Sequence, residues 1–445
     1  MAQAASRRNS ELSLLILALI AGAGALALVA LGRNSNKPDA AIPYVVALVV
    51  CYVIAHIVVR KFAPKADPLI LPMVAALNSL GLAVIYRLTT SEEQFGPAQL
   101  VWTAVGTLFF IAVLVFIRDY RVLARYKYIL GFAGVGLLLL PLAPGIGATI
   151  NGARLWLQVG SYSFQPGELA KICLVIFFAA YLADRKELLA IASRRLMGMH
   201  VPDIKHFGPL LVMWGISLAV MFFERDLGSS LLFFSIFLVM IYIATARVVY
   251  MVFGFALFGV GAYFGYQSFS HVQLRVEVWL DVFNPQRIND EGFQLAQSLF
   301  ALATGGLFGT GFGQGRPDLI PEAQTDFVFS ALGEELGLLG TSAVLLIFLL
   351  LTARGLRIAK NAKDDFGRLL AAGLTSILGI QTIIILGGVT RLLPLTGITL
   401  PFMSYGGSSL LSNFILVALL LRISDASSAE RPAAHTAEIL IGGRR

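Results

Sequence analysis

The hydrophobic positions of this chain fall into long runs that short polar segments separate. There are twelve such runs, at residues 12–31, 42–59, 69–86, 98–117, 128–143, 166–183, 208–223, 227–246, 248–266, 326–352, 369–388 and 403–422. Each is near the roughly 20 residues that an α-helix needs to cross the hydrocarbon core of a bilayer. The pattern predicts an all-α integral membrane protein, a polytopic helical bundle of about twelve transmembrane helices.

The composition supports this prediction and limits where chemistry can occur. Only 13% of the 445 residues are charged, whereas soluble domains carry about 25%. Both cysteines, Cys51 and Cys173, lie inside apolar runs, and we interpret them as small apolar filler. No segment has the composition of a soluble catalytic domain, so any reaction must use loops and helix ends.

The placement of Lys and Arg predicts the orientation of the helices. If the amino terminus lies inside and the helices alternate, most of the 34 Lys and Arg residues fall in cytoplasmic loops and tails. The net charge of +8 is then a topology signal and an attraction for membrane lipid, and we expect no nucleic-acid partner. Both termini are predicted to be cytoplasmic. Residues 424–445, rich in Ser, Ala and Pro, are predicted to form a disordered cytoplasmic tail.

Four groups of polar residues lie near the predicted outer face. In the first, Pro166 and Gly167 mark a helix start, and Glu168 and Lys171 share one helix face at i and i+3. One interpretation is a capping acid with a salt bridge that orients the helix. The other is a polar pocket in which Lys171 and Arg154 hold a phosphate.

The second and fourth groups are short segments between apolar runs. Glu224 and Asp226 lie in a tight connection between two apolar runs. They either cap the next helix or belong to a functional site, and the sequence leaves both interpretations open. Residues 391–409 contain two prolines and a Gly-Gly pair, which predicts a re-entrant turn beside a watery cavity rather than an ordinary turn. The substrate-binding candidates in this segment are Arg391, Ser404 and Ser408.

The third group is the long polar segment at residues 267–325. Loops of this length are more often functional than mere connectors. Its candidate catalytic acids are Asp281 and Asp290, for which a solvated loop charge is the alternative. The glycine-rich residues 305–315 lack the lysine of a phosphate-binding loop, so close backbone approach or hinge flexibility is the better interpretation.

Several of these motifs together resemble the SEDS family (shape, elongation, division, sporulation), which comprises the RodA and FtsW proteins. The motifs span residues 69–422 in the family's order. They are Asn151-Gly-x-Arg-x-Trp with Gln165-Pro-x-Glu-Leu-x-Lys171, Glu224-x-Asp-Leu-Gly228, Thr325-Asp-Phe-x-Phe-Ser-x-x-Gly-Glu-Glu-Leu-Gly337 and Leu400-Pro-Phe-Met-Ser-Tyr-Gly-Gly-Ser-Ser409. Two extra helices within residues 1–66 precede the matching core at 67–423. This extension is most similar to actinobacterial RodA proteins.

The resemblance implies a peptidoglycan glycosyltransferase of the bacterial plasma membrane. Such proteins polymerise lipid II, an undecaprenyl-pyrophosphate-linked disaccharide-pentapeptide, outside the membrane, for cell elongation and shape in the RodA branch. The implied partner is a class B penicillin-binding transpeptidase. A divalent cation, Mg²⁺ or Mn²⁺, is left open as a cofactor with no ligands assigned. The alternatives are a lipid II flippase and a non-catalytic scaffold that activates a transpeptidase.

The resemblance also implies a catalytic acid in the long loop. The family's acid stands in an Asp-Pro-x-Gly-x-Gly-Tyr-Gln-like context, and residues 279–294 here are longer by about two positions. Direct counting places Pro285 or Arg287 at that position. A shifted gap places Asp290 there, whereas Asp281 matches a neighbouring aspartate of some relatives. Asp290 is preferred over Asp281 as the base, and Glu168, Lys171, Arg154, Glu224 and Asp226 are assigned to substrate binding.

Overall fold

The structure is a computed structural model that describes residues 2–33, 38–90, 93–150, 153–159, 162–190, 194–196, 199–201, 208–224 and 226–428. Each of the twelve predicted apolar runs forms a helix. They are α1 (Ala2–Arg33), α2 (Ile42–Phe62), α3 (Ile70–Leu88), α4 (Phe95–Phe116), α6 (Lys127–Leu139), α7 (Gly167–Ala190), α8 (Gly208–Phe223), α9 (Leu227–Thr245), α10 (Val248–Ser268), α13 (Val328–Asn361), α14 (Asp365–Val389) and α15 (Gly407–Ser428). Within the described residues, nine helices are long and apolar enough to cross a membrane, and α6 and α8 belong to shorter apolar helices.

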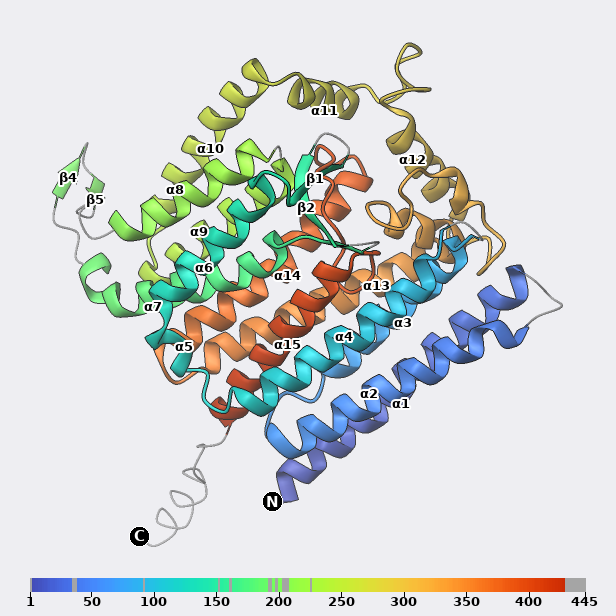
Figure 1. Ribbon diagram of the computed structural model, residues 1–445, viewed down its shortest axis with the longest axis horizontal. Coiled ribbons are helices and arrows are strands. Elements are labelled where there is room, and N and C mark those ends of the chain that lie inside the picture. The colour runs from blue at the N-terminus through green and yellow to red at the C-terminus, as the bar shows by residue number, and fades with distance from the viewer. Residues whose placement is uncertain are drawn as a thin grey trace, which may run out of the picture.

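The helices form a bundle with α14 and α15 at its centre (Figure 1). In the most apolar stretch of each helix, the buried share of the residues is 83% for α14 and 89% for α15. It is only 6% for α10, which lies at the edge. The hairpin of α1 and α2 packs on the opposite side, α1 against α3 and α2 against α4. The start of α1 and the end of α15 lie at the same end of the bundle in Figure 1. A helix that is apolar all round suits either the bundle centre or contact with lipid.

Several elements were not predicted from the hydrophobic pattern. Two short 3₁₀-helices, η1 (Pro38–Ala41) and η2 (Leu140–Leu142), precede α2 and follow α6, and α5 (Val122–Arg125) is a single turn. Strands β1 (Gly147–Ile150), β2 (Ala153–Val159) and β3 (Tyr162–Phe164) form an antiparallel sheet before α7, and β4 (Arg194–Leu196) pairs with β5 (Met199–Val201). The long polar segment contains α11 (Ser270–Leu280), α12 (Phe293–Gly305) and η4 (Pro317–Leu319). It therefore has regular structure of its own.

The glycine-rich segment 305–315 packs its backbone against a break in α13. The helix loses helical geometry at Gly337, where φ is 65° and ψ is −166°. The carbonyl of Glu334 accepts a hydrogen bond from the Thr310 amide at 3.0 Å. A Cβ on Gly309 would lie 2.2 Å from the Glu335 carbonyl oxygen, so only glycine permits this approach. The predicted close backbone approach is confirmed.

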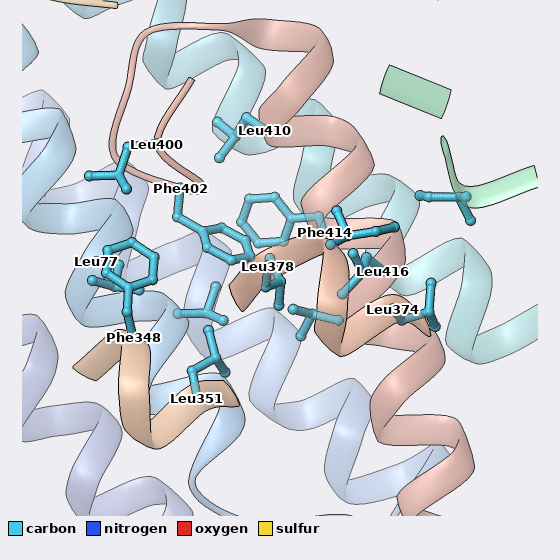
Figure 2. Close-up of a cluster of buried hydrophobic side chains, with 14 of the residues drawn as sticks. Leu77, Phe348, Leu351, Leu374, Leu378, Leu400, Phe402, Leu410, Phe414 and Leu416 are labelled. Carbon is cyan, nitrogen blue, oxygen red and sulfur yellow. The ribbon is translucent and has the colours of Figure 1, made fainter. Parts of the chain in front are cut away.

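Residues 390–406 form an irregular segment between α14 and α15, and most of residues 398–404 are buried. Leu400 and Phe402 are 1% and 2% exposed, and the ring of Phe402 packs edge-on against that of Phe414 in α15 (Figure 2). Side chains of the helices bind its backbone: Gln381 Nε2 donates to the Thr399 carbonyl at 2.7 Å and Gln99 Nε2 to the Ser404 carbonyl at 3.2 Å. Irregular backbone at membrane depth needs such partners because lipid offers none. The predicted non-helical segment is confirmed, buried in protein.

The predicted start of the disordered tail at residue 424 needs correction, because α15 continues to Ser428. Ser424 Oγ accepts a hydrogen bond from the Asp67 amide at 3.0 Å, and Asp425 Oδ1 accepts one from the Lys65 amide at 2.7 Å. These bonds hold the end of the helix against the connection between α2 and α3. Residues 429–445 lie outside the described part of the chain.

The contact between α3 and the irregular segment yields a test of the packing. A Cβ on Gly81 would lie 2.5 Å from the Met403 Cα and 2.6 Å from its carbonyl oxygen, and these backbone atoms cannot turn away. We expect Gly81→Ala to lower the free energy of unfolding by about 1–3 kcal/mol, measured by thermal unfolding of the purified protein in detergent. Gly136→Ala in α6 is the control, because no atom lies within 4 Å of its added Cβ. Equal melting temperatures for the two variants would contradict the close contact between Gly81 and Met403.

Candidate active site

Four acidic or basic side chains are buried where the beginnings of α7, α9 and α15 meet. Exposed fractions are 7% for Glu168, 3% for Lys171, 3% for Glu224 and 8% for Asp226. This region lies at the opposite end of α15 from the carboxyl-terminal tail. Buried charges of this kind cost several kcal/mol unless they are paired and hydrogen-bonded. Their partners therefore show what holds the site together.

Glu168 and Lys171 form the predicted i,i+3 ion pair on α7. Lys171 Nζ lies 2.9 Å from Glu168 Oε1 and donates a second bond to Gln381 Oε1 at 3.3 Å. Ser412 Oγ on α15 donates to the other Glu168 oxygen at 3.1 Å. The pair therefore faces α14 and α15 rather than lipid, as a charge pair within a span must. Gln381 also binds the Thr399 carbonyl, which connects the pair to the irregular segment.

Glu224 and Asp226 occupy the tight turn between α8 and α9. Asp226 Oδ1 accepts a hydrogen bond from the Ser229 amide at 2.8 Å, so it caps α9. Burial, with a smaller effect of the nearby Asp226, raises the pKa of Glu224 to about 8. Burial also raises the pKa of Asp226, while Ser229 and the charge of Lys171 oppose the rise. Arg225, between them in sequence, lies outside the described residues.

A small cavity lies beside Glu224 and Asp226, between the starts of α7 and α9. Gln165, Gly167, Glu224, Asp226 and Ser229 are among the residues that line it. A carboxyl with a pKa of about 8 is mostly protonated at neutral pH and donates a hydrogen bond instead of repelling an anion. Glu224 thus places a neutral hydrogen-bond donor at this cavity, and the charge of Lys171 acts on Asp226 in its wall.

The structure does not join Arg154 to this cluster through a hydrogen bond or ion pair. Arg154 lies on β2, and its guanidinium donates to the Ala143 carbonyl at 3.1 Å. Asn151 and Gly152, at the start of its motif, lie outside the described residues. Arg154 supports the connection between η2 and β1 in this geometry.

The hydroxyls of Ser404 and Ser408 bind backbone groups of the chain itself. Ser408 Oγ accepts a hydrogen bond from the Gln165 amide at 2.8 Å. Ser404 Oγ accepts one from the Leu400 amide at 2.8 Å and donates to the Thr325 carbonyl. Both residues are buried. Ser408 holds the residues before α7 against the start of α15, and Ser404 holds the end of the long loop against the irregular segment.

Arg391 binds the end of α11. Its Nε donates to the Trp279 carbonyl at 2.8 Å and another of its nitrogens donates to the Leu280 carbonyl. These carbonyls belong to the last turn of the helix, which lacks internal partners and carries negative partial charge. Arg275 on α11 donates to the Thr396 carbonyl at 3.1 Å in turn. Arg391 therefore fixes the helix that leads into the predicted acidic loop.

The two predicted loop acids are exposed. Asp281 follows α11 directly and accepts a hydrogen bond from Asn284 Nδ2 at 3.2 Å. The carboxylate of Asp290 has no hydrogen-bond or ion-pair partner among the residues that the structure describes. Neither acid contacts Arg154 or Lys171 in this part of the chain. Which acid serves as the base stays a prediction.

Asp326 is a candidate that the sequence analysis did not single out, although it belongs to the Thr325-Asp-Phe motif. It precedes α13, and its Oδ2 lies 3.6 Å from the position that a Cβ on Gly397 would take. An Arg275 nitrogen lies 3.9 Å from the same point. Burial, followed by the charge of Glu322, raises the pKa of Asp326 to about 7, while Arg275 opposes the rise. The sequence signal for Asp326 was an acidic residue just before a helix. Its position beside Gly397, which is distant in sequence, is visible only in the fold.

No three His, Cys, Asp or Glu side chains within the described ranges are grouped so that they could hold a metal ion. Glu168, Glu224 and Asp226 are oxygen donors of the kind that Mg²⁺ and Mn²⁺ prefer, yet they do not form such a group. A divalent cation therefore stays a prediction without assigned ligands, and no catalytic step is assigned to a cation.

The pKa of Glu224 predicts how stability depends on pH. The folded protein holds this proton up to about pH 8, whereas the ordinary pKa is 4.5. Between these values the folded state binds more protons than the unfolded state, so the free energy of unfolding falls as pH rises, by up to about 1.4 kcal/mol per pH unit for one proton. We expect Glu224→Gln to remove this contribution, measured as melting temperature between about pH 5 and pH 9. The exposed Glu291→Gln variant should keep the wild-type slope; a wild-type slope in Glu224→Gln would refute the assignment.

Comparisons with known proteins identify similar chains. A family model for FtsW, RodA and SpoVE, described as a cell cycle protein, matches residues 68–429. The peptidoglycan glycosyltransferase RodA of Mycobacterium tuberculosis (strain H37Rv) is 47% identical over 435 residues, which are 96% of this chain and 92% of that protein. RodA of Mycobacterium leprae is 45% identical over 434 residues, with the same coverage.

Solved structures are also similar. A chain from a peptidoglycan synthase complex, described for its structural coordination of polymerization and crosslinking, has a TM-score of 0.66 and 26% sequence identity, and the match covers 81% of this chain and 98% of that chain. A mutant of Rod shape determining protein RodA from Thermus thermophilus has a TM-score of 0.58 at 26% identity, covering 81% of this chain and 97% of that one.

Proposed function

Because this chain belongs to the family of FtsW, RodA and SpoVE, we propose that it is a peptidoglycan glycosyltransferase that polymerises lipid II into glycan strands for cell elongation and shape. The mycobacterial relatives named RodA match it along nearly their whole length, including the two helices before the family core. The proposal rests on this match together with the buried charges of the family's motifs, two of which, Glu224 and Asp226, line a small cavity.

The protein is a multi-pass membrane protein, and we propose that it places both termini in the cytoplasm. The excess of Lys and Arg in the loops on the side of the termini supports this orientation. The charged cluster and α11 and α12 then face the outside of the plasma membrane. A class B penicillin-binding transpeptidase is the proposed partner, supported by the likeness to a synthase complex that couples polymerization with crosslinking.

In the proposed reaction, a carboxylate takes the proton from the 4-hydroxyl of the acceptor sugar. The freed oxygen attacks the anomeric carbon of the donor strand, the bond to the lipid pyrophosphate breaks, and the pyrophosphate leaves with the electron pair. Lys171, with Arg154 as a further candidate, offsets the charge of the leaving group. The protonated Glu224 contributes a hydrogen-bond donor without adding repulsion.

The loop aspartates are tested by polymerisation of lipid II with purified protein. We expect Asp290→Ala to lower the rate about 100-fold or more, because a positioned general base contributes about 10²- to 10⁴-fold. Asp281→Ala is assayed in parallel, and Glu291→Ala, at an exposed neighbouring acid, is the control. The assay includes moenomycin, which blocks the unrelated glycosyltransferase fold and excludes a contaminant. Wild-type rates in both aspartate variants would rule out these two residues as the base.

Asp326 is a second candidate for the base, and its pKa of about 7 gives a distinct test. If its carboxylate takes the proton, the polymerisation rate rises with pH through about 7, and Asp326→Asn removes this rise and lowers the rate. Glu322→Gln removes the negative charge that helps to raise this pKa, so we expect the rise to move to lower pH with the same maximal rate. An unchanged pH profile in Asp326→Asn would assign the base elsewhere.

A further inference from the structure

A large polar cavity lies at the opposite end of the bundle from the charged cluster. Its volume is about 350 Å³, and it is open to solvent. Its walls come from the start of α1, the connection between α2 and α3, and the ends of α13 and α15. Arg7, Asp67, Arg354, Arg357, Asn361 and Ser424 are among the residues that line it. The proposed reaction uses none of them.

The charges that line the cavity are not balanced. Asp67 is its one acidic lining residue in the described chain, and it is neutralised by Arg354, whose Nε donates to Asp67 Oδ2 at 2.8 Å. Within the described ranges Arg7 binds two neutral oxygens, the Lys65 carbonyl at 2.9 Å and Ser428 Oγ at 3.3 Å. Arg357 has no hydrogen-bond or ion-pair partner among the described residues. Arg7 and Arg357 are therefore left without an acidic partner in the described chain, which favours the binding of an anion in this cavity.

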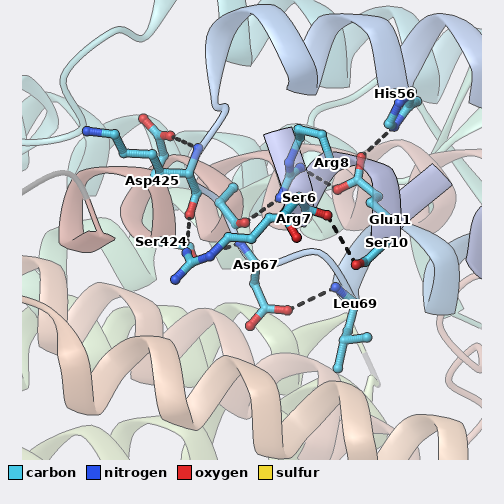
Figure 3. Close-up of polar contacts among 12 residues, drawn as sticks. Ser6, Arg7, Arg8, Ser10, Glu11, His56, Asp67, Leu69, Ser424 and Asp425 are labelled. Carbon is cyan, nitrogen blue, oxygen red and sulfur yellow. Dashed lines mark hydrogen bonds and ion pairs between the residues drawn. The ribbon is translucent and has the colours of Figure 1, made fainter. Parts of the chain in front are cut away.

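The walls of the cavity are fixed by hydrogen bonds between segments far apart in sequence (Figure 3). Ser424 on α15 accepts a bond from the Asp67 amide, and the Asp67 carboxylate accepts one from the Leu69 amide at 3.0 Å. Arg7 reaches the Lys65 carbonyl from α1. The amino-terminal extension, the core and the last helix thus meet at one preformed site, so little ordering is needed when a ligand binds.

The surroundings of Arg357 point to a lipid as the source of the anion. Leu346 and Leu350 on α13 are 57% and 54% exposed, and they lie eleven and seven residues before Arg357, on the same face of the helix. Leu356, next to Arg357, is 45% exposed. In a helix that spans the membrane these exposed leucines contact the acyl chains of lipids. The headgroup of such a lipid then lies near Arg357, beside the cavity.

We propose that this cavity binds the phosphate headgroup of an anionic phospholipid, with Arg357 and Arg7 as its cationic contacts and the acyl chains along the exposed face of α13. Asn361, which is exposed, supplies a further hydrogen-bond donor among the lining residues. Basic pockets between transmembrane helices are suited to such headgroups. The lipid connects α1 to α13 and α15, which gives the amino-terminal extension a role in the assembled bundle. The site is independent of the proposed glycosyltransferase chemistry.

The test measures lipid binding to the full chain purified in detergent. Phosphatidylglycerol is titrated and counted by native mass spectrometry, with phosphatidylcholine in a parallel titration. We expect preferential binding of phosphatidylglycerol, and about fivefold weaker binding in Arg357→Gln and in Arg7→Gln, since one cation near an anionic headgroup contributes about that factor. Lys360→Gln, at an exposed cation one turn further along α13 that is not among the lining residues, is the matched control and should bind as the wild type does.

Thermal unfolding distinguishes a lipid ligand from a free anion as the ligand of the cavity. Phosphatidylglycerol should raise the melting temperature of the wild type more than that of Arg357→Gln, whereas inorganic phosphate at the same concentration should have little effect. Equal lipid binding by Arg357→Gln and Lys360→Gln would overturn the site. Equal protection by inorganic phosphate would overturn the lipid as its ligand. Because Arg357 is exposed and unpaired, its substitution should leave the melting temperature without lipid unchanged.

Discussion

Every backbone polar group of this bundle needs a partner where no water is available. In hydrocarbon an unpaired amide or carbonyl costs several kcal/mol, which favours unbroken helices. This bundle nevertheless breaks α13 at Gly337 and leaves residues 390–406 irregular. Both departures are possible because other segments supply the missing hydrogen bonds. Backbone amides of the glycine-rich segment donate hydrogen bonds to carbonyls of α13, and the side chains of Gln381 and Gln99 donate to carbonyls of the irregular segment.

These same hydrogen bonds position the candidate active site. Gln381 binds both Lys171 and the Thr399 carbonyl, so one amide side chain holds the buried ion pair and the irregular segment together. Arg391 and Arg275 fasten α11 to that segment and thereby place the start of the acidic loop. A polar network of this kind is stabilising only when its members are satisfied. The site therefore lies on the part of the bundle whose geometry is most constrained.

The two ends of the bundle differ in electrostatic character. At one end three carboxyls and a single lysine are buried near one another, and burial favours the protonated form of Glu224. At the other end two arginines that have no acidic partner in the described part of the chain face an open cavity. The amino-terminal extension reaches this second end and also buries its own charges: Glu11 pairs with Arg8 and lies 2.7 Å from His56 Nδ1 (Figure 3). Such buried pairs add little stability, but they fix how two helices align.

The helices, the polar loop and the family could be predicted from the order of residues alone, because the bilayer imposes a length and an apolar composition on each span and because the motifs are specific. The Glu168–Lys171 pair also followed from spacing along one helix. Which polar groups meet across the bundle could not be predicted in this way. In the folded bundle, Arg391 and Ser408 bind backbone groups that are far away in sequence, and Asp326 lies beside Gly397. The contacts of α15 with the connection between α2 and α3 keep it helical past residue 424. Hydrogen-bond partners and burial are properties of the packed bundle, and a pattern along one chain does not contain them.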